Sequence, residues 1–211
     1  CICGGGNYSD VGKDAVVDAR GTVNQVFGGG MNADVDNDTH VTVRGDVEYK
    51  MISGVYVDGA VYGGGLFGNI GGGTNVLLTE GSSAYTVLGG CDNACVTGSS
   101  TVIVNGRIKR LPALDGISLN NFKRGTIDRE LRYSGCVFGA SYISALIDGL
   151  GSVEGGSTVV IGPAAQIDDS VYGGGLYSNC GSTDVTVSGR VDGAVYGGCW
   201  LPDADGAGLL G

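Results

Sequence analysis

The sequence predicts an all-β fold: a parallel β-helix (β-solenoid) of about six to seven coils with one basic insertion. Three observations support this prediction: a short phrase that recurs along the chain, runs of β-branched residues between its copies, and 43 glycines among 211 residues. A phrase repeated at intervals marks a repeat architecture. Short strands in a unit of about 24 residues are typical of a β-solenoid. Right-handed coiling is the default for parallel crossovers.

The repeated phrase consists of a β-branched residue, a large apolar residue and two small residues. Its clearest copy is Val195-Tyr196-Gly197-Gly198, and the other copies begin at Ile2, Val26, Val61, Val87, Val137 and Val171. Coils stack about 4.8 Å apart, so the first position should form an inward column that fills a narrow core. By alternation, the second position should form an outward ladder. The ladder comprises Phe27, Tyr62, Leu88, Phe138, Tyr172 and Tyr196.

Two further features of each unit predict its other strands and its turns. Strand-length β-branched runs at 41–43, 76–78, 102–104, 159–161 and 185–187 are usually preceded by Thr or Ser and followed by Gly. A weaker apolar position recurs at Val23, Val57, Ile167 and Val191. The glycines of the phrase should allow a sharp corner or a positive φ, and should leave a strip that another backbone can approach closely.

The chain reads as one domain, 1–211, whose coils begin at the successive copies of the phrase. Coil two carries an acidic loop at 31–38 and an extension at 48–56, which is expected to form a small hairpin or a longer strand. Coil four is interrupted by an insertion, 107–134. Coil seven ends in a tail, 201–211, which is rich in Gly, Ala and Asp and is expected to be loose.

The acidic loop is a weak calcium candidate. Asp34, Asp36 and Asp38 alternate as at the start of a calcium-binding loop. The sixth position is Thr39 rather than Gly, and the twelfth is Gly45 rather than Glu. A solvated loop is therefore the preferred interpretation, and no cofactor is expected.

Charge limits the partners of this chain. The 12 basic and 22 acidic residues give a net charge of −10, which argues against nucleic acid or an anionic membrane as partner. No apolar run is long enough for a membrane-spanning helix. Most of the positive charge gathers in the insertion, which is interpreted either as a contact arm for an acidic surface such as a neighbouring copy, or as a solvated loop. The basic residues of this arm are Arg107, Lys109, Arg110, Lys123, Arg124, Arg129 and Arg132.

The seven cysteines fit an oxidising, extracellular setting. Their spacing forms no zinc pattern with the single histidine, His40. An odd number leaves at least one thiol free or paired with another molecule. The cysteines considered for disulfides or for contacts between subunits are Cys1, Cys3, Cys91, Cys95 and Cys199.

The ends of the sequence suggest self-association. Neither end contains a helix-forming or strongly charged cap, and solenoid ends expose strand edges that caps normally protect. Head-to-tail contact between such ends is heterologous and generates a filament if it does not close. Cys199 would then lie near Cys1 or Cys3 of the next copy, where a disulfide would fix the joint. The alternative is that flanking sequence of a larger surface protein supplies the caps.

The pattern of polar residues does not favour catalysis. Polygalacturonase-type β-helical hydrolases combine paired aspartates, a Gly-His-Gly element and a later Arg-x-Lys element. In this chain Arg107-Ile108-Lys109 precedes Asp168-Asp169, and His40 is the only histidine. General acid-base catalysis needs these groups within hydrogen-bond reach of one another. The sequence therefore predicts that the protein is not an enzyme.

The phrases Val-Tyr-Gly-Gly-Gly, alternating with Gly-x-Thr-x-Val-Thr-Val-x-Gly, resemble those of large secreted β-helical surface proteins of bacteria, of the adhesin-like and autotransporter passenger type. This resemblance implies a β-helix and a location outside the cell or on its surface. Two functions remain from the sequence. The first is a structural subunit that stacks end to end into a filament or surface fibre. The alternative is an adhesin or carbohydrate-binding segment of a larger bacterial surface protein, which would use the aromatic ladder against sugar rings. For the ladder itself, packing in the core or against lateral neighbours is the preferred interpretation.

Overall fold

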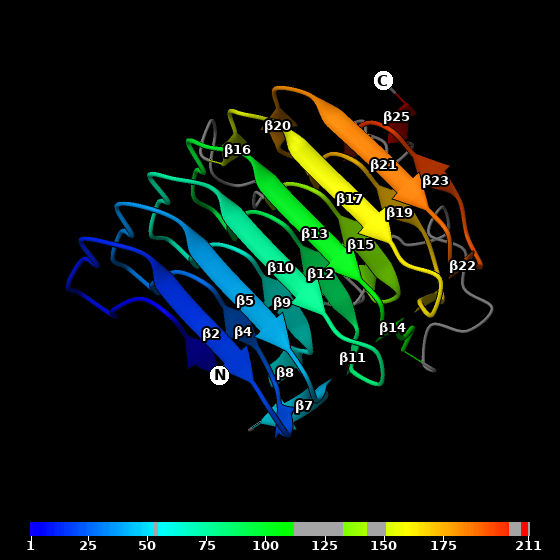
Figure 1. Ribbon diagram of the computed structural model, residues 1–211, viewed down its shortest axis with the longest axis horizontal. Coiled ribbons are helices and arrows are strands. Elements are labelled where there is room, and N and C mark those ends of the chain that lie inside the picture. The colour runs from blue at the N-terminus through cyan, green and yellow to red at the C-terminus, as the bar shows by residue number, and fades with distance from the viewer. Residues whose placement is uncertain (53–54, 112–132, 143–150, 203–207, 211) are drawn as a thin grey trace.

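The computed structural model describes residues 1–52, 55–111, 133–142, 151–202 and 208–210 (Figure 1). Within these residues the fold is all-β. Successive coils stack along one axis, and their equivalent strands form three open parallel sheets that run along this axis. The two termini lie at opposite ends of the stack. The predicted parallel β-solenoid is confirmed.

Each sheet is built from equivalent strands of successive coils. The first sheet comprises β1 (Ile2–Cys3), β4 (Val26–Phe27), β9 (Ala60–Tyr62), β12 (Thr86–Leu88), β15 (Cys136–Phe138), β19 (Val171–Tyr172) and β23 (Val195–Tyr196). The second comprises β2 (Ala15–Ala19), β5 (Thr39–Val43), β10 (Thr74–Leu78), β13 (Ser100–Val104), β17 (Ser157–Ile161) and β21 (Thr183–Val187). The third comprises β3 (Thr22–Val23), β6 (Asp46–Val47), β11 (Ser83–Ala84), β14 (Arg107–Ile108), β18 (Gln166–Ile167) and β22 (Arg190–Val191).

Three short pairs of strands lie outside these sheets. β16 (Ser152–Val153) pairs with β20 (Asn179–Cys180) in parallel. β7 (Tyr49–Ile52) and β8 (Val55–Asp58) form an antiparallel hairpin, so Val57 lies in this hairpin and Val47 occupies the third sheet in its place. β24 (Trp200–Pro202) pairs with β25 (Gly208–Leu210), so part of the tail expected to be loose is a strand pair.

The core is a column of apolar side chains inside the coils. Parallel pairing is in register, so Val26, Val61, Val87, Val137 and Val171 stack directly on one another. They pack against the inward residues of the other two sheets, and every second residue of the inner second-sheet strands is buried. Full burial of a valine contributes about 1.5–3 kcal/mol. The core is therefore spread along the whole axis.

The glycines of the phrase are needed because backbones approach closely. A Cβ on Gly28, Gly63 or Gly89 would overlap the carbonyl oxygen of the equivalent residue in the next coil. Among the described residues, the glycines with positive φ are Gly21, Gly59, Gly81, Gly135, Gly151 and Gly156, and none belongs to the phrase. Close backbone approach is therefore confirmed as a reason for these glycines, and a positive φ is not one.

A column of buried hydroxyls joins the second sheet to the first. Thr39 Oγ1 donates a hydrogen bond to the Gly63 carbonyl and Thr74 Oγ1 to the Gly89 carbonyl, both at 2.5 Å. Ser100 and Ser157 donate in the same way to Gly139 and Gly173. Each hydroxyl therefore ties its own coil to the phrase of the next one.

Candidate functional site

The two ends of the stack form the first candidate site. We call β1, β2 and β3 the N-terminal edge, and β21, β22 and β23 the C-terminal edge. They are the outermost strands of the three sheets and lie at opposite ends of the molecule (Figure 1). Outermost strands have hydrogen-bonding groups on one side that pair with no other strand of the sheet.

The C-terminal edge exposes residues that the other coils bury. Val195 is 47% exposed and Val187 is 38% exposed, whereas the equivalent Val171 and Ile161 are fully buried. Gly197 shows the same difference, because a Cβ there would meet nothing within 4 Å. This edge therefore presents the inward columns of the solenoid to the outside.

The N-terminal edge differs from the C-terminal edge because the inward side chains of its longest strand are buried. The inward side chains of β2 (Ala15, Val17 and Ala19) are buried, while Val16 on its outer face is exposed. Asp18 accepts hydrogen bonds from Arg20 and Arg44 near this edge, at 2.6 and 3.2 Å. The hydrogen bond and charge of Arg20 lower the pKa of Asp18, and Arg44 adds a smaller effect in the same direction.

The aromatic ladder lies on the other side of the first sheet from the valine core. Its rings stack in pairs, Phe27 on Tyr62 at 4.7 Å and Phe138 on Tyr172 at 4.9 Å between centroids. Residues that follow the phrase, such as Leu176, pack against the ladder in a second apolar cluster. Tyr62 and Tyr172 are therefore only 4% exposed. Alternation placed the ladder outside the valine core, and lateral packing covers it over most of its length.

The acidic loop uses its aspartates to bind backbone. Asp34 accepts a hydrogen bond from the Asn69 amide at 2.7 Å, and Asp38 accepts one from the Gly73 amide at 2.6 Å. Asp36 is exposed. Within the part of the chain that the structure describes, no group of three or more His, Cys, Asp or Glu side chains is placed to hold a metal ion. Two of the three calcium candidates thus hold successive coils together.

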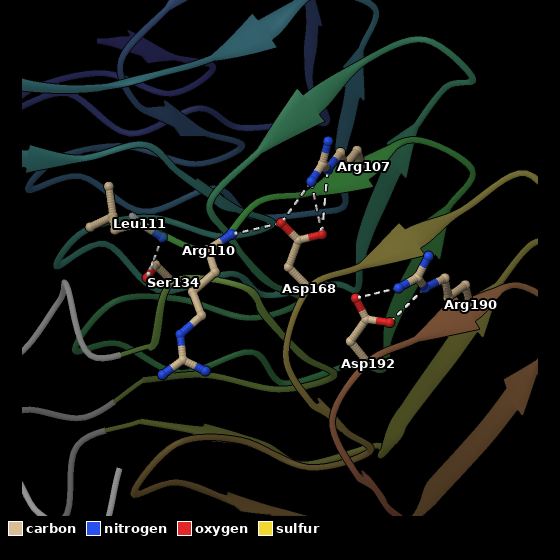
Figure 2. A network of polar contacts seen from close by, with 7 residues as sticks. All are labelled: Arg107, Arg110, Leu111, Ser134, Asp168, Arg190 and Asp192. Carbon is tan, nitrogen blue, oxygen red and sulfur yellow. Dashed lines mark hydrogen bonds and ion pairs between the residues drawn. The ribbon is translucent and has the colours of Figure 1, made fainter. Parts of the chain in front are cut away.

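The described residues of the basic arm are paired with carboxylates from other coils. Arg107 contacts Asp168 at 3.1 Å, and the backbone amide of Arg110 donates to the same carboxylate (Figure 2). The Arg110 guanidinium pairs with Asp169 at 2.7 Å. Lys109 binds Glu48 and lies over the Tyr85 ring. The other residues of the arm, Lys123, Arg124, Arg129 and Arg132, lie outside the described residues.

The residues considered for catalysis are only partly brought together. Arg107 and Asp168 meet as an ion pair on adjacent coils. His40 lies on β5 in the second sheet, between Val16 and Asn75 of the neighbouring strands. The arginine and aspartate therefore neutralise each other, and the histidine belongs to a different sheet.

All seven cysteines lie in the described part of the chain and carry free thiols. The Sγ atoms of Cys1 and Cys3 are 3.5 Å apart at the N-terminal edge. Cys91 is buried, and its thiol donates to the Gly68 carbonyl and, four residues along the chain, to the Cys95 carbonyl. Burial raises the pKa of the Cys91 thiol to about 12.

The sequence pattern did not indicate the neighbour of Cys199. The Sγ of Cys199 lies 3.7 Å from that of Cys180 on the preceding coil. It also missed the role of the buried hydroxyls, although a Thr or Ser two residues before the valine of each run was the visible signal. The Cys180 signal was weaker, because only the coil register reveals that it lies beside Cys199.

No protein-family model, curated protein sequence or solved structure matches this chain. The described residues contain no helix that is long and apolar enough to span a membrane.

Proposed function

We propose that this protein is an extracellular structural β-solenoid subunit that stacks head to tail, the C-terminal edge of one copy on the N-terminal edge of the next. The observation that carries the proposal is the exposure of the core residues Val187 and Val195 at the C-terminal edge. In the inner coils the next coil covers the equivalent residues, such as Ile161 and Val171. A second copy offers such a coil.

The register of the existing coils supports this occupant. Continued by one step, the pairing of β19 with β23 places Val195 on Ile2 of the next copy, as Ile2 itself lies on Val26. Likewise Val185 meets Val17, and Val191 meets Val23. Apolar residues thus face apolar residues in all three strand pairs.

Charge and backbone packing are compatible with the same stack. The charged residues Asp184 and Arg190 would face Val16 and Thr22 of the next copy, so these pairs bring no like charges together. Gly197 would meet the Gly4 carbonyl in the way that Gly173 meets that of Gly197. The contact is heterologous and does not use the same surface twice, so it leads to a filament.

In this stack Cys199 does not lie beside Cys3 of the next copy, contrary to the expectation from the sequence. Backbone hydrogen bonds place Cys199 in the column of Gly6 and Gly175, whereas Cys3 belongs to the column of Tyr196. Cys3 of the next copy would therefore lie over Tyr196, three positions away from the residue that faces Cys199. The proposed joint depends on strand pairing, and a disulfide through Cys199 is not part of it.

The adhesin alternative is not carried forward, because most of the aromatic ladder that would meet sugar rings is buried.

The test compares variants of the two edges by sedimentation velocity and electron microscopy over a range of concentrations. The wild type should form filaments. Gly197→Ala should remain folded and monomeric, because its methyl group is free in the monomer and blocked in the stack. Val195→Asp should do the same.

The matched control is Phe67→Asp, which places the same charge on an exposed apolar residue in coil three, away from both edges. It should assemble like the wild type. A wild type that stays monomeric at every concentration, or a Gly197→Ala protein that still assembles, would refute the proposal.

A further inference from the structure

Cys180 and Cys199 lie in two neighbouring columns of the repeat that are occupied mostly by apolar residues and by glycines, respectively. The position of Cys180 is apolar in the preceding coils, where it is Val11, Val35, Ile70, Val96 and Val153. The position of Cys199 is Gly6, Gly30, Gly65, Cys91, Ser141 and Gly175 in the preceding coils, as the hydrogen bonds to these carbonyls show. The two substitutions fall on adjacent coils, where the columns lie side by side.

The geometry brings the two thiols into contact. Cys180 ends β20 of coil six and Cys199 lies just before β24 of coil seven, and their Sγ atoms are 3.7 Å apart. Cys199 also lies against Gly174, where a Cβ would overlap its sulfur. The missing side chain at Gly174 therefore leaves the space that the Cys199 thiol occupies beside Cys180.

Access distinguishes this pair from the buried thiols of Cys91 and Cys136. Cys91 and Cys136 are buried, and burial raises the pKa of both thiols, which keeps them protonated. Cys180 and Cys199 are half-buried. The hydrogen bond between them raises the pKa of Cys180 and lowers that of Cys199 to about 6. Exposure and thiolate character are the properties of reactive cysteines.

We propose that Cys180 and Cys199 are an intrachain redox pair that links coil six to coil seven as a disulfide when a small-molecule disulfide such as oxidised glutathione is present. The Cys199 thiolate attacks one sulfur of oxidised glutathione, and a mixed disulfide forms as one glutathione thiolate leaves. Cys180 then loses its proton to water and attacks the Cys199 sulfur, releasing the second glutathione. The two protein thiols are oxidised, and one glutathione disulfide is reduced to two thiols.

The pair is independent of head-to-tail stacking, because both residues belong to one chain. If the proposed function holds, its effect is to fasten the coil that forms the C-terminal edge. The reaction should therefore occur in the Gly197→Ala monomer as well as in the wild type, which separates a failure of this inference from a failure of the proposed assembly.

The test equilibrates the folded protein with reduced and oxidised glutathione, traps free thiols with N-ethylmaleimide and digests with chymotrypsin. Cleavage after Tyr177, Tyr196 and Trp200 separates the peptide 178–196, which contains Cys180, from 197–200, which contains Cys199. We expect these two peptides to be joined in oxidising buffer, in a protein that runs as one chain on a non-reducing gel.

Two matched variants sharpen the test. Cys180→Ser should abolish the joined peptides and leave glutathione attached to Cys199, because the resolving thiol is gone. Cys95→Ser, which removes another half-buried thiol, should leave the joined peptides unchanged. Alkylation of both Cys180 and Cys199 throughout the oxidising series would overturn the inference, as would attachment of Cys199 to a different cysteine.

Discussion

Gly63 and Gly197 occupy equivalent positions of the repeat but have opposite surroundings. A methyl group on Gly63 would overlap the Gly89 carbonyl oxygen, while one on Gly197 would touch nothing within 4 Å. We expect Gly63→Ala to lower the free energy of unfolding by about 3 kcal/mol, because the coils must separate to admit the methyl group. Urea denaturation of the monomer measures this loss. Gly197→Ala is the control and should match the wild type; equal stabilities for the two variants would contradict the close packing.

The buried hydroxyl of Thr39 is the second residue whose role can be isolated. Thr39→Val keeps the shape of the side chain but removes the donor to the Gly63 carbonyl, so we expect a loss of about 1–3 kcal/mol. Thr42→Val, on the outward side of the same strand, should change stability by less than about 0.5 kcal/mol. Thermal and urea unfolding of both variants would measure the difference, and similar small effects would show that the hydroxyl column contributes little.

The buried thiols predict a loss of stability at alkaline pH. The pKa of Cys91 is raised by burial from its ordinary value of 9.0 to about 12. Above pH 9 the unfolded chain loses this proton while the folded chain keeps it, so stability falls as the pH rises from 9 toward 12. The slope for one thiol is about 1.4 kcal/mol per pH unit. Urea midpoints between pH 7 and 11 should decline less steeply in Cys91→Ala; an unchanged slope would exclude Cys91 as a cause.

At the level of the strands, the periodicity of the sequence was enough to predict the strands of two of the three sheets. The first and second sheets follow the repeated phrase and the β-branched runs, because a stacked coil places like residues on like residues. The third sheet was less predictable, since a single apolar position in each coil marks its strands and no repeated phrase accompanies it. Val57 was chosen as the third-sheet position of coil two, yet Val47 fills it, because the apolar residues of the hairpin imitate the same signal.

The candidate site was predicted less completely than the strands, because a repeat pattern does not show which residues of other coils lie beside a given side chain. Alternation separates the aromatic ladder from the core, but it does not reveal that Leu176 and its neighbours fold over the ladder. Similarly, the sequence shows that Cys199 is near an end of the chain but not which column it occupies. Contacts between coils depend on the lengths of the loops, which vary from one coil to the next and carry no repeated signal.

The ion pairs of the solenoid should differ in strength according to burial. The Asp169 side chain is 9% exposed and pairs with Arg110, whereas Asp192 is 42% exposed and pairs with Arg190. Asp169→Ala should cost about 3 kcal/mol, because it removes a buried carboxylate that pairs with the largely buried Arg110 guanidinium. Asp192→Ala should cost less than about 0.5 kcal/mol. Chemical denaturation at low and high salt would measure both losses, and equal losses would show that burial does not decide the strength of these pairs.

For the whole molecule, stability is a sum over neighbouring coils. The strands of each coil pair only with the strands of the coils before and after it, so no single central core holds the fold. The strands of coil four have partners on both sides, whereas β21 and β23 have a strand on one side only. Opening should therefore begin at the edges and proceed inward, and the edges are also the surfaces that the proposed stacking would cover.

Hydrogen exchange followed by mass spectrometry measures both the opening of the edges and their coverage by stacking. In the monomer, amides of β21 and β23 should exchange much faster than those of β13, because local opening is easiest where few contacts hold a strand. At filament-forming concentration, exchange at β1, β2, β21 and β23 should slow while β13 is unchanged, since only the edges gain partners. Gly197→Ala should not slow the exchange of its edges. Slower exchange around Arg107 in place of the edges would instead mean that copies associate side by side through the basic arm.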